Sequence, residues 1–163
     1  MSRRARRSLD IVRFEILQMH EEEAQVIATW RYEPPYSFYD ADADAGDLAL
    51  LLREECREGR YFSAFADGAL VGFFEFKSDG DIVVIGLGLR PDLTGRGLGL
   101  SFVEAWMAFA REQFGPTRFQ LSVATFNERA IRVYERAGFL PLRTFDQPTN
   151  GGVFPFLEMT RSS

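Results

Sequence analysis

Residues 86–99 read GLGLRPDLTGRGLG and join an apolar segment to a proline-interrupted turn and three closely spaced glycines. Gly95, Gly97 and Gly99 let the main chain approach an anion closely, because they carry no side chain. An amphipathic segment from about residue 98 to 114 follows, so the loop leads into the positive end of a helix dipole. The spacing therefore predicts that this loop binds an anion such as a pyrophosphate.

The composition bounds the class of protein. The chain has 163 residues, 46% of them hydrophobic, which supports one well-cored domain. We expect a single domain over residues 9–163 and a disordered basic tail over residues 1–8. One cysteine permits no intramolecular disulfide, and no apolar run approaches the about 18 residues of a membrane span, so we expect a cytoplasmic protein without membrane contact. His20 and Cys56 give zinc no ligand set, and we expect no metal.

Charge is unevenly distributed along the chain, whose net charge is −5. Residues 90–136 contain seven arginines and five acids, whereas residues 21–58 contain eleven acids and three arginines. An acidic field attracts cations, but solvated helix and loop faces produce the same pattern. Because the body is acidic and lacks a stacking motif, we expect no nucleic-acid partner.

The hydrophobic pattern predicts an ordered α/β (α+β) alternation. Strands are expected at residues 11–18, 61–66, 70–77, 81–89, 118–125, 139–145 and 153–160. Helices are expected at residues 21–30, 47–59, 98–114 and 127–137, with Asp47 capping the second. Asp67-Gly68 and Asn150-Gly151 are typical of hairpin turns. An aromatic loop, residues 30–39, contains Pro34-Pro35 and cannot continue a helix.

Two familiar nucleotide-binding loops do not fit the glycine spacing. A dinucleotide fingerprint reads G-x-G-x-x-G in the first βα unit, whereas this chain has G-x-G-x-G late in the sequence. A Walker A loop requires a lysine after its last glycine, and Lys77, the single lysine, lies far from the loop. The anion site therefore belongs to another class.

Two segments resemble the GNAT superfamily of acyl-CoA-dependent N-acyltransferases. Residues 89–99 (LRPDLTGRGLG) are similar to the family's pyrophosphate loop, Arg/Gln-x-x-Gly-x-Gly/Ala after an aliphatic-x-Pro step. Residues 127–139 (NERAIRVYERAGF) resemble its Asn-x-x-Ala-x-x-x-Tyr-x-x-x-Gly-Phe block. The resemblance covers roughly residues 61–145. It implies a mixed, largely antiparallel central sheet of about six to seven strands flanked by about four helices.

The resemblance implies acetyl-CoA as the acyl donor. The pyrophosphate would lie on the loop residues Thr94, Gly95, Arg96, Gly97, Leu98 and Gly99. Thr94 replaces the family's Arg or Gln, so main-chain donors must carry the binding. The main chain of Leu87 and Leu89 would pair with the pantetheine arm. Asn127 would contact the same arm through its amide, although asparagine is also a preferred helix N-cap.

The resemblance also implies a mechanism of direct attack by an amine, with Tyr134 protonating the leaving thiolate. A buried structural tyrosine is the alternative reading of Tyr134. Many relatives carry a glutamate on the strand before the loop, but residues 82–89 contain no acid. Glu75, Asp81, Glu33 and the tyrosines of the aromatic loop stay open as the general base, and Glu75 is the residue we select.

The acceptor implied by the family is a primary amine, on a small molecule or at a protein N-terminus. The aromatic loop and the turn at Asn150 would form the acceptor cleft, where rings and acids together suit a cation. The alternative is a non-catalytic acyl-CoA-binding sensor or interaction module. The residues leave the oligomeric state open, a homodimer included.

Overall fold

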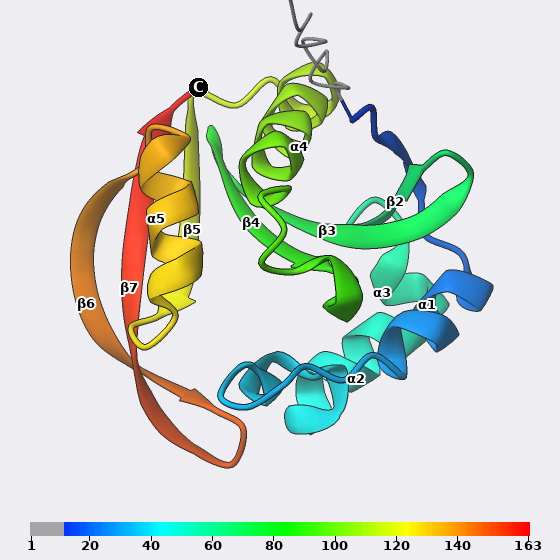
Figure 1. The fold of residues 1–163 in the computed structure, drawn as a ribbon. Coiled ribbons are helices and arrows are strands. Elements are labelled where there is room, and N and C mark those ends of the chain that lie inside the picture. Colours follow the sequence, from blue (N-terminus) through cyan, green and yellow to red (C-terminus); the bar gives the residue numbers. More distant parts are fainter. Residues whose placement is uncertain (1–11) are drawn as a thin grey trace, which may run out of the picture.

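Residues 12–163, which the computed structural model describes, contain seven strands and five α-helices (Figure 1). The strands are β1 (Glu15–Gln18), β2 (Tyr61–Ala66), β3 (Ala69–Asp79), β4 (Ile82–Leu89), β5 (Arg118–Ala124), β6 (Leu140–Thr149) and β7 (Gly152–Ser162). The α-helices are α1 (Glu21–Ala28), α2 (Ala45–Leu52), α3 (Glu54–Arg57), α4 (Gly99–Phe114) and α5 (Glu128–Arg136). Short 3-10 helices are η1 (Tyr36–Tyr39), η2 (Ala41–Ala43) and η3 (Pro91–Leu93). The basic tail expected over residues 1–8 lies outside the described residues.

All seven strands belong to one sheet, in the order β1-β2-β3-β4-β5-β7-β6. Every neighbouring pair is antiparallel except β4 and β5, which run parallel. The expected mixed, largely antiparallel sheet is confirmed. Within residues 12–163, no helix is both long and apolar enough to pass through a bilayer.

The hairpins follow their turn residues. Asp67 and Gly68 adopt φ values of 50° and 78°, as the turn between β2 and β3 requires. Asn150 and Gly151, at 51° and 73°, make the equivalent turn between β6 and β7. Asparagine, aspartate and glycine tolerate this left-handed backbone best, which is why the sequence located both turns.

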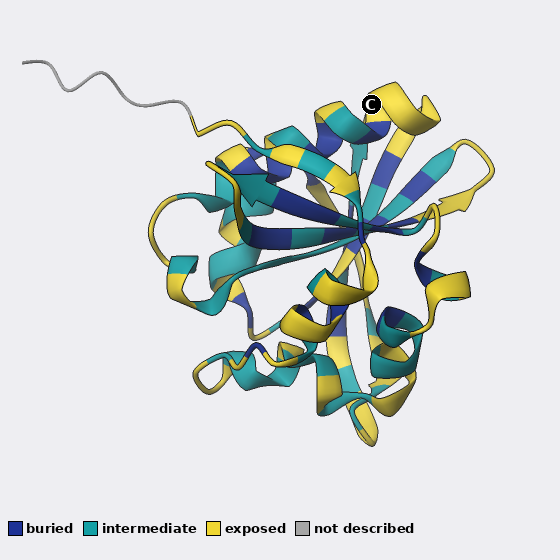
Figure 2. Ribbon diagram, turned by 90° about the vertical axis from the view of Figure 1, so that its right-hand side faces the viewer, coloured by how far each residue is buried: buried dark blue, intermediate teal, exposed yellow. Residues whose placement is uncertain are grey.

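Two hydrophobic clusters lie on opposite faces of the sheet. Phe74 on β3 packs with Phe102 and Trp106 of α4, the face on which α5 also lies. The neighbouring Phe73 points the other way and contacts the cluster that contains Trp30. Figure 2 shows buried residues along the central strands and exposed residues on the outer helices. Alternation from Phe73 to Phe76, beyond the irregularity that leaves Val71 unpaired with β2, therefore assigns these side chains to the two faces in turn.

The helix expected over residues 47–59 is two helices, and this prediction is wrong at Arg53. Arg53 has extended backbone (φ −90°, ψ 123°), which ends α2 and starts α3. The guanidinium of Arg57 donates to the Leu51 carbonyl at 3.0 Å, so the break leaves that carbonyl satisfied. Asp44 caps α2 by accepting from the N–H of Asp47 at 3.0 Å, so Asp47 is not the cap.

Gly72 on β3 tests how tightly α4 packs on the sheet. An added Cβ would lie 2.5 Å from Phe102 Cζ and 2.7 Å from the Gly88 carbonyl oxygen. We expect Gly72→Ala to lower the free energy of unfolding by about 1–3 kcal/mol, through overpacking. Urea unfolding followed by circular dichroism measures it.

Gly86→Ala is the matched control for that substitution. Its added Cβ meets atoms of Glu75 at 3.5 Å, an ordinary contact, on the adjacent strand. It should change stability by less than about 0.5 kcal/mol. Equal unfolding midpoints for the two variants would contradict the packing described here.

Candidate functional site

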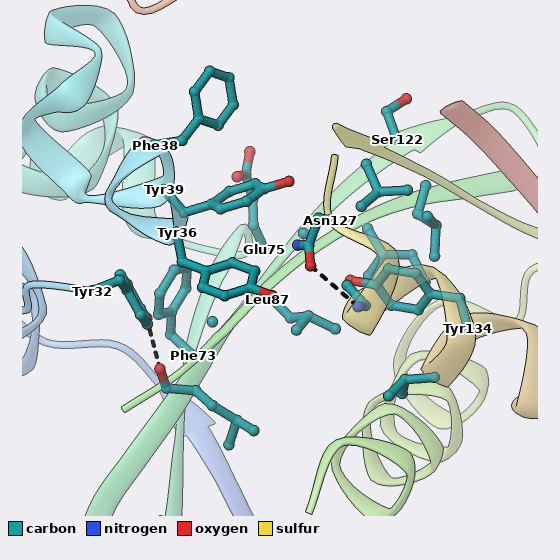
Figure 3. A pocket seen from close by; sticks show the side chains of 18 of the residues that line it. Tyr32, Tyr36, Phe38, Tyr39, Phe73, Glu75, Leu87, Ser122, Asn127 and Tyr134 are labelled. Atoms are coloured by element: carbon teal, nitrogen blue, oxygen red, sulfur yellow. Dashed lines mark hydrogen bonds between the residues drawn. The ribbon is translucent and has the colours of Figure 1, made fainter. Parts of the chain in front are cut away.

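The central feature of the site is a cleft between β4 and β5. These parallel strands pair only at Ile82–Arg118, Val83–Phe119 and Val84–Gln120, and then part. A cavity of about 960 Å³ lies where they separate (Figure 3). Its lining includes residues 84–89 of β4 and Leu121, Ser122 and Val123 of β5. Polar main-chain groups on these strand edges therefore face the cavity rather than a neighbouring strand.

The β4 edge of the cavity presents its main chain in a defined register. The Arg90 N–H donates to the Val71 carbonyl of β3 at 2.8 Å. Because successive residues of a strand point their N–H and C=O to opposite sides, Leu89 and Leu87 direct theirs toward the cleft. The hydroxyl of Tyr32 donates to the Leu89 carbonyl at 2.6 Å. The two leucines expected to offer main-chain groups thus lie on the cavity edge.

The glycine loop forms one end of the cavity. Gly95 and Gly97 have φ values of 73° and 79°, which favour glycine. Leu98, the N-cap of the 16-residue helix α4, has no side chain that accepts a hydrogen bond from the first turn. The first N–H groups of α4 therefore lack a side-chain partner there. The Thr94 hydroxyl donates to the Pro91 carbonyl at 2.8 Å and closes the turn. Four loop residues line the cavity, namely Thr94, Gly95, Gly97 and Gly99, whereas Arg96 and Leu98 do not.

A positive side chain that the sequence reasoning missed lies beside this loop. Arg129 of α5 lines the cavity, with Nη1 3.6 Å from the position of a Cβ on Gly95. Its guanidinium carbon lies 4.0 Å from the centre of the Tyr36 ring. This cation–π contact holds the charge at the loop. The sequence around Arg129, five residues after the end of β5 at Ala124, carries no signal for this role, because the partners of Arg129 come from distant segments.

The α5 side of the cavity carries the two residues expected from the second motif. Asn127 is 9% exposed, and its Oδ1 accepts from the Ala130 N–H at 3.2 Å, so it does cap α5. Tyr134, two turns further along, also lines the cavity. Burial raises the pKa of the Tyr134 phenol, and the neighbouring Tyr39 raises it further. Figure 3 shows Asn127 and Tyr134 on the same side of the cavity.

Acidic side chains enter the cavity from the opposite face. Glu75 of β3 accepts from Arg60 Nε and Nη2 at 3.0 and 2.7 Å through Oε1, and Lys77 Nζ lies 3.7 Å from that oxygen. Asp47 of α2 also lines the cavity, and its pKa is raised by burial and then by the charges of Asp44 and Glu75. Asp81 and Glu33, the other acids considered as bases, do not line it.

A loop over residues 32–44, which we call the bridging loop, connects the parted strands. Tyr32 bonds to the end of β4, and the Ala124 N–H at the end of β5 donates to the Tyr39 hydroxyl at 3.2 Å. Asp44 accepts from the Asn150 N–H at 3.0 Å, and Asn150 Nδ2 donates to the Phe38 carbonyl at 2.8 Å. One loop therefore contacts both edges of the cleft and the β6–β7 turn.

Aromatic rings fill the space under the bridging loop. Phe38 packs edge-on against Phe126 and Phe154, with ring centres 5.5 and 5.0 Å apart. Tyr36 and Tyr39 also contact Phe126, at 6.3 and 6.0 Å. Of the aromatic residues expected at an acceptor cleft, Tyr32, Tyr36, Phe38 and Tyr39 line the cavity, whereas Trp30 does not. Among residues 12–163, no group of three or more potential metal ligands is found.

The comparisons with known proteins agree with this geometry. A model described as the acetyltransferase (GNAT) family matches residues 16–139, and the chain belongs to this family. Mycothiol acetyltransferases of Propionibacterium freudenreichii and Streptomyces coelicolor are 36% and 37% identical to it, over 84 and 89 residues. These matches cover 47% and 52% of the chain, but only 26% and 28% of the relatives. The chain thus spans about a quarter of the length of these curated relatives.

Solved structures share the fold at low sequence identity. A spermidine N-acetyltransferase from Vibrio cholerae in complex with CoA and spermine superposes with a TM-score of 0.74 at 15% identity, covering 91% of this chain and 95% of that one. Aminoglycoside acetyltransferase AAC(6')-Ib in complex with coenzyme A gives 0.73 at 20% identity, covering 92% and 95%. Similarity at this level establishes the fold.

Asp44 offers a test of how the bridging loop is held. Hydrogen bonds from the N–H groups of Asp47 and Asn150 lower the pKa of this carboxyl. A lowered folded-state pKa stabilises the protein above the ordinary value near 4, and this contribution is lost as the pH falls further. Asp44→Asn keeps an acceptor oxygen but removes the charge. We expect its thermal midpoint to lie below that of the wild type at pH 7 and to converge with it below about pH 3.

Asp44→Ala removes the acceptor oxygen as well. It should therefore have a lower thermal midpoint than Asp44→Asn at every pH, because α2 loses its cap and the β6–β7 turn loses its anchor. Thermal unfolding followed by circular dichroism between pH 3 and pH 8 makes both comparisons. Identical midpoints for the alanine and asparagine variants would contradict the anchoring role.

Proposed function

We propose that the protein is an N-acetyltransferase that transfers the acetyl group of acetyl-CoA to a primary amine. The observation that carries the proposal is the cavity between the parted strands, with an anion-binding loop at one end and Tyr134 on its wall. Membership of the acetyltransferase family supports the reaction class. The solved neighbours in complex with CoA support the choice of donor.

The loop suits a diphosphate. Gly97 has open space around the position of its absent Cβ, and Gly95 has only Arg129 Nη1 nearby. Main-chain N–H groups can therefore reach phosphate oxygens at the start of α4. We propose that Arg129 supplies the side-chain charge that Thr94 lacks. Arg96 and Leu98, which lie outside the cavity lining, contribute through their main chain.

The strand edge suits a pantetheine arm. Leu87 and Leu89 direct their main-chain groups into the cleft, where amide groups of the arm can pair with them as a neighbouring strand would. Since the Leu89 carbonyl already accepts from Tyr32, the partners for the arm are both main-chain groups of Leu87, and the N–H of Leu89 is left for the thioester. Asn127 lies opposite, and its Nδ2 is the part of the amide not used in capping α5.

In the reaction, acetyl-CoA supplies an activated acetyl group as a thioester. The neutral amine forms the N–C bond, the C–S bond breaks, and the products are an acetylated amine and CoA thiol. Tyr134 gives its phenolic proton to the departing sulfur; the proton lost by the amine is taken up by Glu75 and returns through solvent to the Tyr134 phenolate, which restores both groups. The N–H of Leu89 points into the cleft and is suited to stabilise the developing oxyanion.

Glu75 is the proposed acceptor of the proton lost by the amine. It pairs across the ladder with Gly86 of β4, and its Oε2 lies 3.5 Å from the position of a Cβ on that glycine. The Glu75 carboxylate thus lies over β4, a strand that contains no aspartate or glutamate of its own. Arg60 engages Oε1, which leaves Oε2 as the oxygen directed toward the cavity.

The acceptor we propose is a small cationic amine. Asp47 and Glu75 provide negative charge, and Tyr36 and Tyr39 provide ring faces, both of which attract ammonium groups. The hydrogen bond from the Asn150 N–H to the Asp44 carboxylate holds the bridging loop against the β6–β7 turn and narrows this side of the cavity. A protein N-terminus would have to enter past this contact between the bridging loop and the β6–β7 turn, so a protein is the less favoured acceptor.

The loop assignment predicts the effect of charge at Gly97. Gly97→Asp places a carboxylate next to the bound diphosphate and should raise the Kd for CoA about 100-fold. Gly97→Asn has the same size, and asparagine tolerates the left-handed backbone better than most residues, so its loss should be about tenfold. Isothermal titration calorimetry measures both. Unchanged binding by a folded aspartate variant would refute the loop assignment.

Tyr134→Phe tests turnover. Thiol release with acetyl-CoA is measured against spermidine, kanamycin, alaninamide and a short peptide with a free N-terminus. The wild type should release CoA with at least one amine, and the phenylalanine variant should lose about 100-fold in kcat while keeping its affinity for CoA. CoA binding without product on any of these amines would instead favour an acyl-CoA-binding module.

A further inference from the structure

The ionisable side chains that line the cavity are divided by charge. Among residues 12–163, all the acids in the lining come from the bridging loop, α2 and β3, and they are Asp40, Asp44, Asp47 and Glu75. The basic residues in the lining are Lys77, which lies 3.7 Å from Glu75, and three arginines of α5, Arg129, Arg132 and Arg136. The α5 side of the cavity is therefore positive, in a chain whose net charge is −5.

The three arginines form a row along one side of α5, which we call the arginine row. They occupy positions i, i+3 and i+7, and at about 100° per residue this spacing keeps them within about 60° of one another around the helix axis. Tyr134 lies about 140° or more away from each of them. Because Tyr134 and the arginine row all line the cavity, the cavity extends along α5 from the phenol to the row.

The glycine loop meets α5 between these two places. A Cβ on Gly99 would lie 3.1 Å from Val133 Cγ2, and Arg129 Nη1 lies 3.6 Å from the position of a Cβ on Gly95. Around the helix axis, Val133 lies about 40° from Arg129 and about 100° from Tyr134. A ligand with its thioester at Tyr134 and its diphosphate on the loop therefore continues toward the rest of the arginine row.

Arg132 and Arg136 have no partner within the protein that neutralises their charge. Both are exposed, and within residues 12–163 neither forms an ion pair with a carboxylate. Glu128 and Glu135 are the acids of α5, and neither lines the cavity. Solvated arginines on an outer helix face are the alternative. The place of both arginines in the cavity lining, on the side away from the acids, favours an anionic ligand instead.

CoA carries a second anionic group that suits these two side chains. Its ribose bears the diphosphate at the 5′ position and a phosphomonoester at the 3′ position, and a phosphomonoester has a charge of about −1.5 to −2 at pH 7. Measured along the α5 axis from Arg129, Arg132 lies about 4.5 Å away and Arg136 about 10 Å away. The row can thus contact both phosphate groups of one ribose. Arginine suits this task because its N–H groups bind phosphate oxygens in pairs.

We infer that Arg132 and Arg136 bind the 3′-phosphate of acetyl-CoA and thereby make the protein select CoA over donors that lack this phosphate. The inference rests on the proposed function, which supplies CoA as the donor. Arg129 then holds the diphosphate at the loop, and the other two arginines hold the nucleotide end of the same ligand. They act on the affinity for the donor and not on the chemical step.

The test is the ratio of the Kd values for 3′-dephospho-CoA and CoA, measured by isothermal titration calorimetry. The wild type should bind CoA at least about tenfold more tightly, the effect of a charge-assisted hydrogen bond. Arg132→Gln and Arg136→Gln should each lower this ratio, and the double variant should bring it below about twofold. The Kd for 3′-dephospho-CoA should stay within about twofold in all three variants, because this ligand lacks the group that the arginines bind.

Arg53→Gln is the matched control. Arg53 is an exposed arginine outside the cavity lining, so its substitution removes the same charge and should leave the ratio unchanged. A ratio that survives the double substitution would overturn the inference. Equal losses of affinity for both ligands would also overturn it, because the arginines would then act on the shared diphosphate or on the fold.

The wild type alone separates the two proposals. A wild type that binds neither CoA nor 3′-dephospho-CoA refutes the proposed function, because the donor site is then wrong. A wild type that binds both ligands with equal affinity refutes only the role of Arg132 and Arg136, since the loop and the β4 edge still hold the rest of the molecule.

Discussion

The site exists because two parallel strands stop pairing. β4 and β5 share three residue pairs, and beyond Val84 and Gln120 their edges face an open cavity. Unpaired main-chain groups at strand edges are costly unless something else bonds to them. In this protein the chain satisfies part of that need with tyrosine hydroxyls, at the Leu89 carbonyl and the Ala124 N–H. The edges not used in this way are the ones a strand-like ligand can pair with.

The position of each functional group follows from the two faces of the sheet. Alternation along β3 sends Phe74 into the core under α4 and Glu75 to the face covered by α2. α5 brings Asn127 and Tyr134 to the cavity from the α4 face, while the bridging loop brings Tyr39 from the other. An acyl donor bound near α4 and an amine acceptor bound near α2 would thus meet in the gap between β4 and β5. The parting of the strands is what allows groups from opposite faces to touch.

Much of this arrangement could be predicted from local sequence. Turn residues located both hairpins, helical spacing identified the buried face of α4, and the glycine loop was placed at the start of that helix. The break at Arg53 could not be predicted, because it depends on Arg57 reaching the Leu51 carbonyl. The cap at Asp44 was missed since Asp47 satisfies the same local preference.

The tertiary contacts of the site could not be predicted from local sequence patterns. Tyr32 and Tyr39 look alike in an aromatic stretch, and only the fold shows that one bonds to β4 and the other to β5. Arg129 has the same limitation, because its position beside Gly95 depends on how α5 packs against α4. From the sequence, Glu75 is one of several candidate acids, and its register opposite Gly86 is the feature that distinguishes it.

The bridging loop has a consequence for protein engineering. Residues 32–44 line the wall where an amine is expected, so they are the natural choice for anyone who wishes to exchange acceptor preference between homologous enzymes. The same residues hold the ends of β4 and β5, and a transplanted segment lacking either phenol would also disturb the thioester side. Selectivity is better redesigned through side chains that line the cavity without bonding to strand ends or holding Arg129, such as Asp47 of α2.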